Sequence, residues 1–217
     1  MPPTERPLRR DAERNRRRLV ECATDLMSRN GLGVSYEEVA REAGMGIGTV
    51  YRRFPDRQDL FDAVFGEHID AVCALADDAA ADEDPWRGLV GFFERQLQLE
   101  EATPALGMAM RGDAGSAAVV RRAHEHVTPV VRGLLARAAD AGQVPAGLTP
   151  ADLVAVHRMV GSVLDASREH APDLWRRALA IALAGLRHAD LPGPAPTDDV
   201  VEVLFGHPPT TTTGGTP

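Results

Sequence analysis

The chain has 217 residues, of which 44% are hydrophobic, 26% charged and 5% aromatic, a composition typical of a soluble globular protein of one or two domains. No apolar run approaches the ~20 residues that a membrane-spanning helix requires, and the arginine-rich start lacks the apolar centre of a secretory signal, so we expect a cytoplasmic protein with no membrane partner. The net charge of −8 argues against indiscriminate binding of nucleic acid.

The charge is unevenly spread along the chain. Residues 1–20 contain seven arginines and three acids, giving +4, whereas residues 71–217 contain twelve arginines and nineteen acids, giving −7. Residues 21–70 contain five arginines and ten acids, giving −5, so DNA contacts in that part must come from individually placed side chains. Residues 1–10 are predicted to form a disordered basic arm, and its arginines either reach a DNA backbone or minor groove or are simply solvated.

Apolar residues recur at helical spacing from one end of the chain to the other, without strand-like alternation, so we predict an all-α fold. The first helix covers about residues 11–30 and ends at two glycines. The second begins at Ser35, which forms a capping box with Glu38, and ends at Gly44. The third is short because Pro55 disfavours helical geometry in the residue before it. The fourth begins after Asp56 and runs into the seventies.

The second half of the chain is predicted to form further helices over residues 85–101, 116–141, 149–170 and 172–188. Pro129 must kink or restart the second of these, because proline has no amide hydrogen and crowds the preceding turn. Residues 191–217 are low in core-forming side chains and are predicted to form a disordered tail. Cys22 and Cys73 are far apart and lie in helical patterns, so we expect both to be small buried hydrophobic residues.

The segment AGMGIGTVYRRFPDRQDLF, residues 43–61, has the features of a helix-turn-helix, in which the second helix enters the DNA major groove. A helical wheel separates an apolar side from an outward side that is small at its start and basic at its end. The apolar side contains Ile47, Val50, Tyr51 and Phe54, and the outward side contains Gly48, Thr49, Arg52 and Arg53. Each glycine costs about 1 kcal/mol of helix stability relative to alanine, and a close approach of the backbone to DNA would supply the reason. The alternative is a glycine-rich corner with solvated arginines, which suits Arg53 alone better than the whole set.

The stretch YEEVAREAGMGIGTVYRRFPDRQDLFDAVF resembles the DNA-binding segment of TetR-type (TetR/AcrR) transcriptional regulators, with a match over about residues 17–65. The shared features are an Ala-Gly turn, a Gly-Thr-Val-Tyr recognition helix, the Phe-Pro after it, and a basic residue followed by leucine. The resemblance implies DNA contacts from six residues: Gly46, Gly48, Thr49, Tyr51, Arg52 and Arg57.

Within that set, the resemblance implies that Tyr51 and Arg57 bind phosphates while Gly48, Thr49 and Arg52 face the groove. The chain departs from the family at two of these positions. Gly46 stands where many members have serine, so a helix cap and a hydrogen bond to phosphate are missing. Arg57 stands where lysine is usual, and arginine also binds phosphate.

The resemblance further implies a DNA-binding domain over residues 11–56 and a helical effector-binding and dimerisation domain over residues 57–190. The last helix is apolar around much of its surface and needs burial from more than one direction, and Gly161 and Gly185 would let a neighbouring helix come close. We therefore predict a four-helix dimer interface, with a wholly intramolecular core as the alternative. Its residues are Leu153, Val156, Val160, Leu164, Leu174, Trp175, Ala178, Ile181, Ala182 and Gly185.

An effector pocket could be lined by an apolar set with a few polar groups, and Arg111 could bind an anionic effector. Taken singly, each residue fits ordinary core or surface better than a pocket. The set is Phe92, Phe93, Met108, Met110, Arg111, His124 and His157. His124 and His126 point apart on a helix, so no metal site is expected. The sequence contains no nucleophile elbow, phosphate-binding glycine loop or convincing carboxylate pair, so we predict no catalytic residues, no cofactor and no enzymatic activity.

We therefore predict a homodimeric, ligand-responsive regulator that binds a double-stranded DNA operator. The resemblance implies a repressor released by a small-molecule effector of unknown identity, and an activator is the alternative. The helix that begins near residue 57 would couple the two domains. The alternative is a helical small-molecule-binding protein or enzyme with a non-functional DNA-binding head. Gly46 and the negative net charge are the features that favour this alternative.

Overall fold

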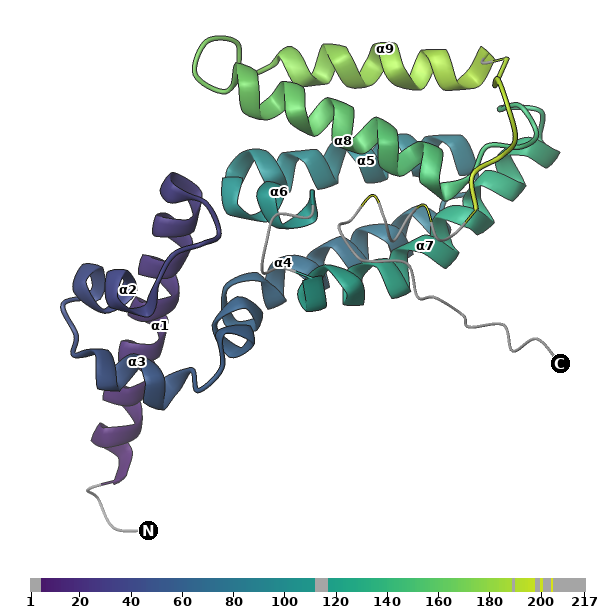
Figure 1. The fold of residues 1–217 in the computed structure, drawn as a ribbon. Helices are drawn as coiled ribbons and strands as arrows, with labels where there is room; N and C mark the ends of the chain where they lie inside the picture. The colour runs from purple at the N-terminus through teal and green to yellow at the C-terminus, as the bar shows by residue number, and fades with distance from the viewer. Residues whose placement is uncertain (1–4, 112–116, 189, 198–199, 201–203, 205–217) are drawn as a thin grey trace, which may run out of the picture.

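The computed structural model describes residues 5–111, 117–188, 190–197, 200 and 204, and in this part of the chain it contains nine α-helices and no strand. The predicted all-α fold is confirmed. Figure 1 shows α1, α2 and α3 gathered in a head at one end, α5 to α9 in a larger body, and α4 running from the head into the body. The helices are α1 (Glu5–Asn30), α2 (Tyr36–Ala43), α3 (Ile47–Arg53), α4 (Arg57–Ala80), α5 (Pro85–Ala102), α6 (Pro104–Met110), α7 (Ala117–Asp140), α8 (Pro150–Ser167) and α9 (Leu174–His188).

The helix ends in the head are set by local hydrogen bonds that the sequence predicts. The Ser35 amide donates to the Glu38 carboxylate at 2.8 Å, and the Glu38 amide donates to the Ser35 hydroxyl oxygen at 3.3 Å, which completes the capping box. The bond from the Ser35 amide, and then the bond from its hydroxyl, lower the pKa of Glu38. Gly44 ends α2 in the left-handed conformation with φ 67°. A second capping box, formed by Asp56 and Asp59, begins α4.

One terminal prediction needs correction, and the predicted disordered tail stays a prediction. Helix α1 begins at Glu5, so residues 5–10, predicted as a disordered arm, are helical. Pro7 is tolerated because it lies in the first turn, where an amide hydrogen would have no helical partner, and arginine is a good helix former. At the other end, Nη1 of Arg158 donates to the Leu204 carbonyl at 2.5 Å, so this position of the predicted disordered tail is held. Residues 1–4 and most of those beyond 197 lie outside the described residues.

Helix α7 continues through Pro129, so the predicted restart at this proline does not occur. Val131, Leu134 and Leu135 follow it and are buried in the core of the body. Their burial supports the helix beyond the missing hydrogen bond, because tertiary packing contributes most of the stability of helices in proteins.

Two hydrophobic clusters form the core, and α6 belongs to the one in the head. The body cluster includes Phe92, Leu97 and Trp175. The head cluster contains side chains from α1, α2, α3 and α4, together with Leu106 and Met110 from α6. Helix α6 contacts both α1 and α5. The head is therefore attached to the body through α6 as well as through α4.

Half of the predicted dimer interface lies inside this core. Five of its residues are at most 5% exposed within one chain, because α8 and α9 turn these side chains toward the rest of the body; they are Leu153, Val156, Val160, Leu164 and Trp175. For them the prediction is wrong, and the intramolecular alternative is correct. The other five are exposed or half-buried, and an interface that includes them stays a prediction: Leu174, Ala178, Ile181, Ala182 and Gly185.

A buried ion cluster fastens α5, the end of α6 and α8 to one another. The carboxylate of Glu100 is fully buried; it accepts a hydrogen bond from Nη1 of Arg111 at 2.8 Å, and it lies 2.7 Å from Nε2 of His157. The other terminal nitrogen of Arg111 pairs with Asp165. Because an ionised carboxylate only accepts hydrogen bonds, Nε2 of His157 carries the proton in this arrangement.

Two glycines make room for the Arg111 guanidinium. A Cβ atom placed on Gly107 would lie 2.6 Å from Nη2 of Arg111, and one placed on Gly161 would lie 2.6 Å from Nη1. Both distances are far inside normal contact. The absent side chain of Gly161 thus makes space for a cation of the same chain, and not for a neighbouring helix as the sequence predicts.

The cluster makes stability depend on pH through Glu100. Burial raises the pKa of its carboxyl, but the charge and hydrogen bond of His157, and then those of Arg111, bring the pKa below its ordinary value of 4.5. A carboxyl whose pKa is lower in the folded state stabilises the fold at pH values above its unfolded pKa, and this contribution is lost as the pH falls through the folded pKa.

We predict that Glu100→Gln lowers the free energy of unfolding by on the order of 3 kcal/mol at pH 7, because it removes the charge that compensates the buried Arg111. Below pH 4.5 the difference between the two proteins should shrink as the native carboxyl becomes protonated. Urea unfolding of both proteins at equal concentration, from pH 7 down to the acid limit of folding, measures the difference. A difference that stays constant at all pH values would contradict the role given to Glu100.

Candidate DNA-binding head and ligand cavity

The start of α3 is bare backbone, and no contact within the chain requires it to be. Gly46 precedes the helix with φ −70° and no side-chain cap, and Gly48 lies in its first turn. Both glycines are exposed, and a Cβ atom on either would find no atom of the protein within 4 Å. Neither a left-handed backbone nor internal crowding therefore requires glycine here. Gly48 destabilises the helix relative to alanine, whereas Gly46 is at the N-cap position, where glycine is common.

The side chains of α3 divide largely as the helical wheel predicts. Val50 and Phe54 are buried in the head, and Arg52 and Arg53 are exposed. Ile47 departs from the prediction, because it lies at the first turn, beyond the packed surface, and is 37% exposed.

Tyr51 lies at the edge of the packed side of α3. It is 52% exposed, and its ring stands edge-on to that of Tyr36 with 5.0 Å between the ring centroids. Tyr36 was not among the residues predicted to matter, yet its hydroxyl lies 2.9 Å from the Phe54 carbonyl and 2.7 Å from the Asp56 carbonyl. Burial, followed by the nearby charge of Asp56, raises the pKa of Tyr36. Tyr36 thus fixes the turn after α3 and supports the ring of Tyr51.

Arg57 makes contacts that its predicted role does not include. Its Nη1 donates to the Val34 carbonyl at 2.8 Å and its Nη2 to the Leu32 carbonyl at 2.6 Å, and the guanidinium lies 5.3 Å from the centroid of the Phe61 ring. Arg57 therefore ties the start of α4 to the turn between α1 and α2. A phosphate contact would have to use its remaining N–H groups, and this contact stays a prediction.

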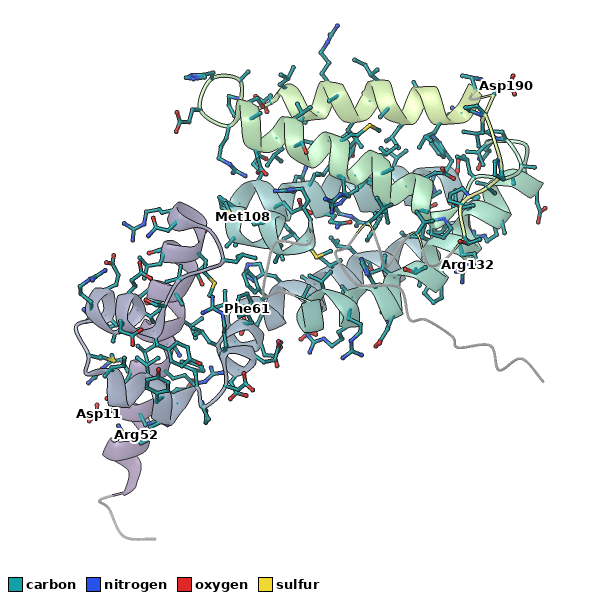
Figure 2. The ribbon with its side chains drawn as sticks, in the orientation of Figure 1. Asp11, Arg52, Phe61, Met108, Arg132 and Asp190 are labelled. Carbon is teal, nitrogen blue, oxygen red and sulfur yellow. The ribbon has the colours of Figure 1, made fainter. Side chains whose placement is uncertain are left out.

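The arginine-rich start of α1 lies beside the end of α3. The guanidinium of Arg16 is 5.7 Å from the centroid of the Phe54 ring. In Figure 2, Asp11 and Arg52 both lie at the end of the head that is farthest from α9. Exposed arginines of α1 and α3 are thus gathered at one end of an otherwise acidic molecule; they are Arg10, Arg14, Arg16, Arg17, Arg18, Arg52 and Arg53.

The body contains a cavity of about 50 Å³ between α4, α5, α6, α7 and α8. Five of the seven predicted pocket residues line it: Phe92, Phe93, Met110, His124 and His157. The sequence reasoning missed two polar lining residues, Gln96 and Thr128. Their spacing indicates that both face the cavity, because each lies four positions after a predicted lining residue and so on the same side of its helix.

Met108 and Arg111 do not line this cavity, and for them the prediction is wrong. Met108 lies on another side of the short helix α6 and packs against the head cluster. Arg111 is held in the ion cluster by Glu100 and Asp165. Met110, in contrast, both lines the cavity and belongs to the head cluster, so it joins the two functional regions within a single side chain.

The residues that the structure describes contain no group of three or more histidines, cysteines or acidic residues that could hold a metal ion. They also contain no helix with the length and apolar character needed to cross a bilayer.

Comparison with other proteins gives the same division of the chain. The family model described as "Bacterial regulatory proteins, tetR family" matches residues 19–64, which cover most of the head and the start of α4. The model described as "Transcriptional regulator SbtR-like, C-terminal domain" matches residues 84–188, which cover α5 to α9.

Individual relatives agree with these matches. An HTH-type transcriptional regulator of Staphylococcus aureus is 43% identical over 54 residues, which are 24% of this chain and 29% of that protein. The chain therefore spans less than a third of this curated relative in the match.

Solved structures match over more of the chain. A TetR transcriptional regulator of Streptomyces coelicolor is 25% identical, with a TM-score of 0.50 over 79% of this chain and 98% of that one. FadR of Bacillus subtilis, solved with stearoyl-CoA, shares the fold at 14% identity, with a TM-score of 0.59 over 77% of this chain and 97% of that one. With both its head and its body matched by models of one group of regulators, the chain belongs to the TetR family of bacterial transcriptional regulators.

Proposed function

We propose that this protein is a cytoplasmic, ligand-responsive transcriptional regulator that binds a specific DNA operator as a homodimer and acts as a repressor. The observation that carries the proposal is the start of α3, where two exposed glycines leave the backbone bare and Gly48, inside the helix, has no internal contact that requires glycine. A double helix lying against this surface supplies a reason, because the missing side chains let its edge come close to the backbone.

The side chains around this bare surface suit a DNA major groove. Arg52 can donate two hydrogen bonds to a guanine, and the methyl group of Thr49 can contact a thymine. Tyr51, half exposed at the edge of α3, can donate its hydroxyl hydrogen to a phosphate. The arginines of α1 add positive charge at the same end of the molecule, which offsets the net charge of −8 where the operator would lie.

Dimerisation would use the outer surface of α8 and α9. Ile181 is 64% exposed, and Leu174 and Met159 are also exposed large apolar side chains. Burial of these side chains against a second copy would remove them from water. Two heads about 34 Å apart would then reach successive major grooves of a two-fold symmetric operator.

Ligand response would start at the cavity and reach the head through α6. Met110 lines the cavity and packs in the head cluster, so a ligand that displaces it moves a side chain on which α1 and α4 also pack. This route runs beside the coupling through α4 that the sequence analysis proposes. A ligand would release the operator if it favours a head separation that no longer fits the DNA. FadR, which shares the fold, was solved with a ligand, which supports a ligand-binding role for the body.

We predict that Tyr51→Ala together with Arg52→Ala abolishes specific operator binding, because both side chains are exposed on the proposed reading surface and neither is part of the core. The measurement is a mobility-shift titration on the DNA upstream of the gene, with scrambled competitor and at two salt concentrations. Specific binding by the native protein should weaken with salt, since phosphate contacts release counterions.

The matched control is Arg121→Ala, an exposed arginine on α7 in the body, which should leave binding unchanged. Helicity and dimerisation should be native in both variants. Unchanged binding by the double variant would refute the role of α3, and an absence of specific shift in the native protein would favour the helical ligand-binding alternative.

We also predict that Ile181→Asp shifts the protein toward monomers, because it places a charge in the proposed dimer contact. Sedimentation equilibrium over a concentration range measures the dissociation constant, which should rise at least about tenfold. Ile47→Asp makes the same change at an exposed isoleucine of the head and should leave the dimer intact. Equal dissociation constants for both variants would exclude Ile181 from the interface.

A further inference from the structure

We infer that the cavity selects an uncharged, largely apolar small molecule that carries a hydrogen-bonding group, and that it rejects both anions and cations. This inference rests on the proposed function, in which the cavity is the effector site. It replaces the expectation of an anionic effector held by Arg111, and its basis is the way in which the charges next to the cavity are already paired.

The wall of the cavity is mostly apolar. Four of its fourteen lining residues have side chains that can exchange hydrogen bonds with a ligand, namely Gln96, His124, Thr128 and His157; the others are aliphatic or aromatic except for Pro150 and Met110. Among the lining residues that the structure describes there is no lysine, arginine, aspartate or glutamate. Such a wall favours the burial of carbon atoms with one or two directional polar contacts.

The nearest charges are fully engaged with one another. Of the two carboxylate oxygens of Glu100, Oε1 pairs with His157 and Oε2 pairs with Arg111. The second terminal nitrogen of Arg111 pairs with Asp165. The guanidinium cannot readily turn toward the cavity, because it lies between the backbones of Gly107 and Gly161 and is held at both ends.

Among the described residues, a charged ligand would therefore meet no free countercharge. An anion entering the cavity would lose its water shell and meet cations that Glu100 and Asp165 already neutralise. A cation would meet a Glu100 carboxylate whose two oxygens are both occupied. An unpaired charge in an apolar site is strongly unfavourable, whereas a hydroxyl or carbonyl group can be satisfied by the polar side chains of the wall.

The cavity is so small that a ligand can bind only if part of the wall moves. Its volume of about 50 Å³ is well below the roughly 150 Å³ of an engineered apolar cavity that binds benzene. Met110 has the most flexible side chain on the wall and can give way at low cost. Since Met110 also packs in the head cluster, a ring-sized ligand would act on the element that joins the body to the head.

The test compares three probes of similar size that differ in charge: phenol, benzoate and benzylamine at pH 7. Isothermal titration of the full-length protein, supported by thermal shift, gives a dissociation constant for each. We expect phenol to bind at least about tenfold more tightly than either ion. Binding of benzoate or benzylamine as tight as that of phenol, or no binding of phenol, would overturn the inference.

A variant links this selectivity to the ion cluster. Glu100→Gln removes one negative charge beside Arg111 and His157, so the affinity for benzoate relative to phenol should rise at least about tenfold. The matched control, Glu125→Gln, changes an exposed carboxylate on α7 and should leave the ratio unchanged. An unchanged ratio in a folded Glu100→Gln protein would overturn the role of the cluster; if this variant does not fold, the three probes on the native protein decide.

Operator binding is measured separately, so the two proposals can fail independently. Specific operator binding without preference for phenol would refute the ligand class and leave the regulator intact. Preference for phenol without specific operator binding would refute the proposed function and leave the selectivity of the cavity standing. Release of operator by phenol would support both.

Discussion

The pairing of Arg111 with Glu100 fixes the position of α6, and much of the molecule depends on that position. A buried carboxylate is tolerated only where donors meet it, so α5, the end of α6 and α8 must meet in one register for Glu100 to be ionised. Helix α6 has only seven residues and holds Leu106 and Met110 in the head cluster. The same contact that compensates a buried charge therefore sets where the head is attached.

Local chemistry made most of the head predictable. The capping boxes at Ser35 and Asp56, the left-handed Gly44 and the proline after α3 each act within a few residues, so the sequence contains nearly all of the information that places them. The beginning of α1 differs from the prediction because residues 5–10 were assigned to a basic arm, although Pro7 lies in the first turn, where proline costs least. For the same local reasons, the recognition helix lies where its spacing predicts.

The body was less predictable because helical periodicity shows that a surface is buried and not what buries it. Val156 and Val160 belong to an apolar stripe that suits a partner subunit as well as the chain's own α5 and α7, and the structure uses it internally. The partners of an arginine side chain are equally hard to predict from the sequence. Arg111 pairs with Glu100, eleven residues away in the sequence, and with Asp165, fifty-four residues away. Arg57 donates hydrogen bonds to carbonyl groups that lie more than twenty residues earlier. Sequence gives the charge of such a residue, but only the fold decides whether that charge is free to meet a ligand.

Glycines in helices illustrate the distinction on which both proposals depend. Gly107 and Gly161 lack a side chain because the guanidinium of Arg111 occupies that space, so their cause is internal. Gly46 and Gly48 face no atom of the chain and have ordinary backbone geometry, so no internal contact requires glycine at either position. Gly107, Gly161 and Gly48 lie within helices and carry a similar penalty in helix propensity, whereas Gly46 is an N-cap residue, a position where glycine is common. Gly107 and Gly161 let the Arg111 guanidinium pack in the ion cluster, where Glu100 and Asp165 neutralise its charge. That charge is therefore not free to meet a ligand in the cavity. Gly46 and Gly48 leave the head bare beside Arg52, where an external partner with phosphates and base edges can approach.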